Sequence, residues 1–172
     1  MITQTALAAA AAPAGNNHLI VTHQTTASDA LVQAAREIAV RDPKAEFTLI
    51  IPAVPMARGL TWTEGESFAV AARALRLGRA ALEQAGLKVA TAFVGDESPV
   101  EAIADILLRD GPYATIIVST PSSSFFRWLK LDVESRVRRR FSLPVLSVIA
   151  PRDQCGIASS ANIAMRTGVR PL

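Results

Sequence analysis

Cysteine, aromatic residues and long apolar runs are all scarce in this chain of 172 residues. Its single cysteine, Cys155, cannot form an internal disulfide and has no metal-ligating residues at the usual spacing. Such cysteine usage is typical of proteins that stay in the reducing cytoplasm. No apolar run approaches the roughly 20 residues that a bilayer-spanning helix needs, so we expect no membrane partner.

Signature motifs of several enzyme classes are also missing. The sequence has no Gly-x-x-x-x-Gly-Lys-Ser phosphate loop, no Gly-x-Ser-x-Gly nucleophile elbow and no His-x-x-x-His metal pair. The serines Ser122, Ser123 and Ser124 have no general base beside them in the sequence. We therefore predict that the protein is not an enzyme, that it has no metal site and that it requires no cofactor.

Positive charge is present, but it is concentrated in one segment. Residues 125–141 carry six basic and two acidic residues, a local charge of +4, whereas the whole chain carries only +3. The rest of the chain is therefore close to neutral. This distribution indicates a local surface for an anion or a partner and argues against general binding of nucleic acid.

Short apolar runs alternate with segments of helical periodicity. Expected strands cover residues 18–22, 46–51, 87–94, 114–119 and 145–150, and expected helices cover residues 29–40, 64–85, 99–108 and 133–141. Unbroken Val, Ile and Leu runs are typical of parallel strands that are buried on both faces. We predict an α/β fold: a doubly wound, open, five-stranded parallel sheet, Rossmann-like, with helices on both faces. The strand order should reverse between the first and fourth strands.

The periodic pattern defines one domain, residues 18–150. Residues 1–17 are rich in alanine and lack a basic start, which favours a disordered tail over a signal peptide. Residues 151–172 have no regular pattern, and we expect a second, mostly disordered tail there.

Several segments carry a resemblance to the universal stress protein family across residues 18–150. They are TASDAL at 26–31, VGDESPVEAI at 94–103, IIVST at 116–120, DVESRV at 132–137 and LPVLSV at 143–148. The resemblance implies a five-stranded parallel sheet in a small cytoplasmic protein without firm enzymatic activity. It also implies a homodimer formed through the last strand, Val145 to Ala150. Some members of this family bind ATP and others do not.

The positions that mark the ATP-binding members all differ here. Those members have an Asp at the end of the first strand and a Gly-x-x-Gly loop that closes on Gly-Ser or Gly-Thr. In this sequence the Asp position falls on His23 or Gln24, the loop glycines fall on Ser119 and Ser122, and the closing pair falls on Leu131 and Asp132. The resemblance therefore implies a member that is not a strong ATP binder.

The loop after the fourth expected strand retains groups that can bind a small anion. Glycines let successive amides face one phosphate, serines make that geometry costlier, and Pro121 removes one amide donor. Serine hydroxyls and an arginine can nevertheless hold a phosphate or sulfate. The candidate binding residues at this edge of the sheet are Thr22, His23, Pro52, Ser119, Ser122, Ser123, Ser124, Arg127 and Asp132.

Ordinary structural roles compete with binding at two of these residues. Asp132 precedes the expected helix 133–141, and we predict that it is the N-cap and fills the anion site with its own carboxylate. His23 has no acid or second histidine beside it to form a relay, so an ordinary polar role is favoured over ligand contact.

Three functional interpretations remain open. The preferred one is a non-catalytic module that acts by dimerisation, by partner association or by binding a small anionic ligand. The second is an adenine-nucleotide-binding stress regulator that uses Ser122 to Ser124 and Arg127 in place of glycines. The third is an enzyme that acts on a nucleotide or phosphoester. The last strand, Val145 to Ala150, has no charged residue and would invite aggregation if left bare, which favours pairing with a second copy.

Overall fold

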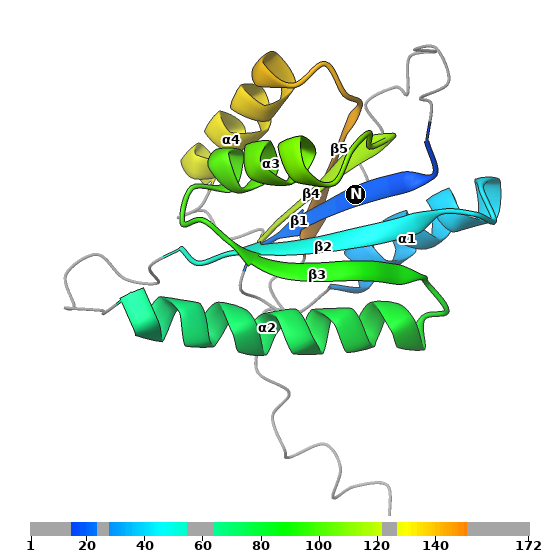
Figure 1. Cartoon of the computed structure of the whole chain (residues 1–172), viewed down its shortest axis with the longest axis horizontal. Coiled ribbons are helices and arrows are strands. Elements are labelled where there is room, and N and C mark those ends of the chain that lie inside the picture. Colours follow the sequence, from blue (N-terminus) through cyan, green and yellow to red (C-terminus); the bar gives the residue numbers. More distant parts are fainter. Residues whose placement is uncertain (1–14, 24–27, 55–63, 122–126, 151–172) are drawn as a thin grey trace, which may run out of the picture.

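The computed structural model describes residues 15–23, 28–54, 64–121 and 127–150, and at Glu64, Pro121 and residues 127–132 it describes the backbone alone. Helices and strands alternate along these segments: β1 (Asn17–Thr22), α1 (Asp29–Arg41), β2 (Glu46–Pro52), α2 (Glu64–Gln84), β3 (Val89–Gly95), α3 (Pro99–Arg109), β4 (Thr115–Pro121), α4 (Arg127–Arg140) and β5 (Val145–Ala150). The strands form one parallel sheet in the order β3-β2-β1-β4-β5 (Figure 1). The predicted fold, with its reversal between the first and fourth strands, is confirmed.

Two apolar clusters hold the helices against the two faces of the sheet. On one face, Leu31 and Ala35 of α1 and Leu82 of α2 pack against side chains such as Ile20 and Phe47. On the other face, α3 and α4 cover Leu19, Val21, Ile50, Ile116 and Val118. Every second side chain of a strand points to the same face, so a central strand needs apolar residues at nearly every position. The unbroken apolar runs of the sequence meet that need.

Local signals set most of the helix ends. Ser28 caps α1 by accepting a hydrogen bond from the Leu31 amide at 3.3 Å. Ser98 lies at the N-cap position of α3 but makes no capping bond, and its own amide donates to Asp96 Oδ1 at 2.7 Å instead. After α2, Gly86 adopts a φ of +82°, the left-handed conformation that glycine adopts without strain.

The start of α4 differs from the sequence prediction. We expected a helix from residue 133 with Asp132 as its N-cap, but α4 begins at Arg127. Asp132 therefore lies more than one turn inside the helix, and the predicted cap is wrong. The physical reason is that Arg, Leu and Lys, which dominate residues 127–131, are good helix formers, and their summed propensity extends the helix past a favourable capping residue.

The beginning of the domain also needs a correction. Residues up to 17 were expected to be a disordered tail, but Asn17 is the first residue of β1. The Asn16 carbonyl accepts a hydrogen bond from the Glu46 amide at 2.8 Å, and the Asn17 carbonyl accepts one from the Ala114 amide at 2.7 Å. Sheet pairing thus recruits two polar residues that carry no apolar signal. Residues 1–14 and 151–172 of the expected tails lie outside the described residues.

Candidate functional site

Four of the candidate residues lie at the carboxyl edge of the sheet. Thr22 ends β1 and is in register with Ser119 of β4, at the point where the strand order reverses. His23 follows Thr22 directly, and Pro52 ends the neighbouring strand β2. The structure thus brings Thr22, His23, Pro52 and Ser119 to the edge where ligands bind in sheets of this type.

Ser119 is part of the sheet rather than of a loop. The fourth strand was expected to end at Ser119, but β4 continues to Pro121, and its last three residues are in register with residues 148–150 of β5. The Ser119 side chain is only 4% exposed. Because β1 and β5 flank this residue, its backbone lies within the hydrogen-bonded ladder. A glycine-rich phosphate loop needs free amides that curl toward one anion, and an extended strand does not supply them.

At the end of β1, Thr22 is buried and His23 is half-buried. Thr22 is 4% exposed, and its hydroxyl donates a hydrogen bond to the His23 carbonyl at 3.4 Å. Burial lowers the pKa of His23 below its usual value of 6.5, because an apolar environment disfavours the charged imidazolium. His23 is therefore neutral at pH 7, and it cannot replace the Asp of an ATP site as a charged group.

The remaining candidates are not brought together by the described structure. Ser122, Ser123 and Ser124 lie outside the described residues. Arg127 is the first residue of α4, and Asp132 lies further along the same helix, where the backbone alone is described. The anion site predicted from the serine loop thus stays a prediction, whereas its self-occupation by a capping Asp132 is excluded by the position of that residue.

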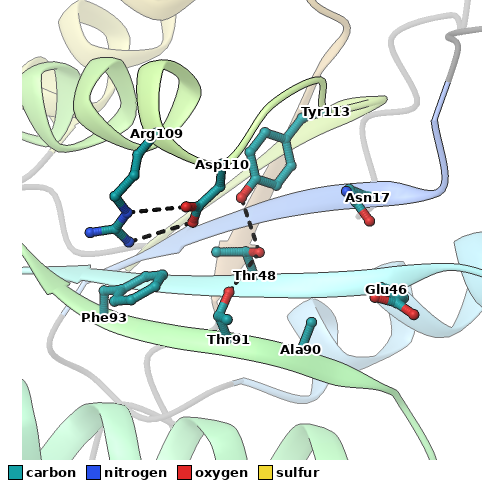
Figure 2. Close-up of a pocket in the computed structure, with 9 residues that line it drawn as sticks. All are labelled: Asn17, Glu46, Thr48, Ala90, Thr91, Phe93, Arg109, Asp110 and Tyr113. Carbon is teal, nitrogen blue, oxygen red and sulfur yellow. Dashed lines mark hydrogen bonds and ion pairs between the residues drawn. The ribbon is translucent and has the colours of Figure 1, made fainter.

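A hollow of about 360 Å³ lies at the opposite edge of the sheet (Figure 2). Asn17 and Glu46, the first residues of β1 and β2, line one side of it, and Phe93 and Tyr113 lie further in. None of its residues was singled out from the sequence. They come from four separate segments, and no local motif marks them.

Several polar groups of this hollow pair with one another. The Tyr113 hydroxyl donates to Thr48 Oγ1 at 3.1 Å, and Thr48 is in turn 3.1 Å from Thr91 Oγ1. Burial raises the pKa of Tyr113, which keeps the phenol protonated. The Arg109 guanidinium lies 4.1 Å from the centre of the Phe93 ring and donates to both carboxylate oxygens of Asp110. These contacts stabilise the corner where α3 meets the sheet, and they already occupy several of the polar groups that line the hollow.

Two further properties bear on the chemistry of the molecule. Within the part of the chain that the structure describes, no three His, Cys, Asp or Glu side chains are placed to hold a metal ion. None of the described helices combines the length and the apolar character that a membrane span requires.

Comparisons with known proteins identify the architecture. No protein-family model matches the chain, and no curated protein matches it. Among solved structures, a universal stress protein in complex with cAMP aligns with a TM-score of 0.52 at 19% identity, covering 77% of this chain and 96% of that one. A protein of the universal stress protein family from Burkholderia pseudomallei aligns with a TM-score of 0.51 at 19% identity, covering 78% and 98%. Together with the strand order and the alternation of strands and helices, these alignments show that the chain has the fold of the universal stress proteins.

Proposed function

We propose that this chain is a non-catalytic, cytoplasmic module of the universal-stress-protein type that acts by associating with a second copy through β5. The observation that carries the proposal is the edge strand itself. β5 lies at one end of the sheet, and its residues Leu146 and Ile149 are 38% and 48% exposed. No charged residue interrupts the strand.

A bare edge of this kind is unfavourable for a monomer. The outward backbone groups of an edge strand can pair with another strand, and natural proteins usually protect such edges with charges, prolines or bulges. Among the described side chains, Arg138 donates to one of these groups, the Val145 carbonyl. β5 has none of these protections in the sequence VLSVIA. Pairing of β5 with its copy around a two-fold axis would satisfy the backbone and remove both apolar side chains from water.

The carboxyl edge of the sheet supports the proposal that ATP binds weakly or not at all. Ser119 lies within β4, and the strand continues to Pro121, so the expected phosphate loop begins with extended backbone. Pro121 has no amide hydrogen to donate. His23 is neutral, so the charged group that marks the first strand of ATP-binding members has no equivalent here. These features support a module that works through its surface rather than through ATP.

Light scattering with one charged variant tests the association. Ile149→Lys places an ammonium group on an exposed position of β5 and should convert a dimer into a monomer at tens of micromolar protein. Leu77→Lys is the matched control, because Leu77 is an apolar residue of α2 with a similar exposure, 49%, and α2 packs against β2 and β3 at the other side of the sheet. The proposal is contradicted if the parent protein is monomeric, or if both variants change the molar mass equally.

Binding of an adenine nucleotide is a second candidate function. It is favoured by one observation: an aligned universal stress protein was solved in complex with cAMP. In this chain, a nucleotide would lie at the carboxyl edge beside His23 and Pro52, with the serine loop and Arg127 toward its phosphate. Calorimetry with cAMP and with ATP, with and without magnesium, tests it. Micromolar affinity that His23→Gln weakens would favour this function, and the absence of binding at millimolar nucleotide would remove it.

A further inference from the structure

The arginines at the end of α4 line a hollow that shares no lining residue with β5 or with the candidate residues of the carboxyl edge. α3 and α4 cover the same face of the sheet (Figure 1). Between them is a space of about 280 Å³ lined by Val100 of α3 and by Arg136, Arg139 and Arg140 of α4. The apolar face of α4 is occupied by Val133 and Val137, which pack into the core and turn these arginines outward.

One of the three arginines is fixed in place by α3. Arg140 donates from Nη1 to Glu101 Oε1 at 2.5 Å and from Nη2 to Oε2 at 3.2 Å. This two-pronged contact raises the pKa of Arg140 and orients its guanidinium plane at the rim of the hollow. The neighbouring Arg138 is not part of the lining. It pairs with Glu134 at 2.8 Å and donates to the Val145 carbonyl at 3.3 Å.

The charge of Arg139 has no matching carboxylate among the described side chains. Its Nε donates to the Ser135 carbonyl at 3.2 Å, which is a neutral acceptor. That bond holds the base of the guanidinium group and leaves its terminal nitrogens to donate elsewhere. Glu101 offsets the charge of Arg140, whereas the charge of Arg139 is offset by no carboxylate among the described side chains, so the hollow keeps a net positive charge. Val100 is the second residue of α3, so the positive end of that helix dipole adds to the same potential.

The size and the charge of the hollow together select a ligand. At about 280 Å³ it is smaller than the roughly 300–1,000 Å³ of pockets that enclose drug-sized molecules. Guanidinium groups match the oxygens of phosphate in geometry, and a phosphoryl group carries about −1.5 to −2 charges at pH 7. We propose that this hollow binds a single phosphoryl group, either as free phosphate or on a phosphorylated side chain of a partner.

Titration of the full chain with inorganic phosphate, followed by the NMR signals of the arginine Nε–Hε groups, tests the site. The signals of Arg136, Arg139 and Arg140 should move together and saturate. Arg139→Gln should weaken phosphate binding by about fivefold or more, the usual consequence of losing a charge-assisted hydrogen bond. Arg76→Gln, a change of an exposed arginine on α2, is the matched control and should leave the affinity unchanged.

A variant that strengthens binding makes the test sharper. Glu101→Gln removes the carboxylate that competes for Arg140 and should tighten phosphate binding by about twofold or more. Comparing the affinity for a phosphoserine peptide with that for free phosphate then identifies the ligand that carries the phosphoryl group. Tighter binding of the peptide indicates a phosphorylated partner, and equal binding indicates free phosphate.

Two results would overturn the proposal. One is the absence of any shift in these arginine signals at millimolar phosphate. The other is binding that Arg139→Gln leaves unchanged, which would place the anion elsewhere, for example at the loop after β4. Unfolding midpoints equal to that of the parent show that the variants are folded. Neither result affects the proposed association through β5, which light scattering measures separately.

Discussion

Gly95, the last residue of β3, lies beside α3 with no room for a side chain. A Cβ atom added there would lie 2.7 Å from the Ala102 Cβ of α3 and 2.9 Å from the Ile50 Cγ2 of β2. Carbon atoms in favourable contact are about 3.5–4.0 Å apart, so the added methyl group would intrude by roughly 1 Å. Both neighbours are buried, and Ala102 has no rotamer by which to move aside.

Gly95→Ala should therefore force α3 away from the sheet. Overpacking of a well-packed core costs about 1–3 kcal/mol, and here the relief must come from a whole helix rather than from one side chain. At roughly 2–4 °C per kcal/mol for a chain of this size, a loss of about 2 kcal/mol lowers the melting temperature by about 4–8 °C. Urea unfolding gives the same free energy independently, through a lower midpoint at an unchanged slope.

Gly78→Ala is the matched control, because it adds the same methyl group with the opposite expected sign. Gly78 lies inside α2, where a Cβ atom would be 3.4 Å from Leu49 Cδ2, an ordinary contact with the end of a side chain. Replacing an interior helical glycine by alanine gains up to about 1 kcal/mol. Coupling between Gly95→Ala and Ala102→Gly in a double-mutant cycle identifies the contact. The reasoning is refuted if Gly95→Ala is as stable as the parent protein, or if the two glycine variants change stability alike.

Three other changes probe separate parts of the structure. Ser28→Ala removes the cap of α1 and should cost about 0.5–2 kcal/mol in urea unfolding, whereas Ser28→Asp should retain most of the stability. Tyr113→Phe removes the hydrogen bond to Thr48 and should cost about 1 kcal/mol, and a loss below the error of the measurement would count against that bond. His18, only 6% exposed, should make the protein less stable in acid. Burial lowers its pKa, so the folded state binds the proton less readily than the unfolded chain, whose value is 6.5. Stability should be full above pH 6.5 and should fall as the pH drops below it, and His18→Leu should flatten that part of the curve.

The sequence predicts the sheet well because its strands obey a simple rule. Central parallel strands are buried on both faces and must be apolar throughout, so runs such as Leu49 to Ile51 are visible without any knowledge of the fold. The expected and observed bounds of these elements differ by only a few residues at most ends. The cap of α1 is also a local feature: the sequence offers Thr26 or Ser28 for it, and Ser28 makes the capping bond.

The candidate site is less accessible to sequence reasoning. The start of α4 was misplaced because Asp132 is a favourable cap, and the pattern does not show that the preceding residues would join the helix. The arginine-lined hollow forms only when α3 packs beside α4. This packing places Val100 and Glu101 next to arginines that lie about forty positions later in the sequence. The sequence shows a basic segment there, and the tertiary contacts show which of its arginines face one another.

Hydrogen exchange of the two edge strands tests the proposed association most directly. β3 and β5 are the outer strands of the sheet, and in a monomer the outward amides of both should exchange rapidly. If two copies pair through β5, its outward amides should become protected as the protein concentration rises, while those of β3 should remain unprotected at every concentration. Equal and concentration-independent exchange of the outward amides in both strands would contradict the account.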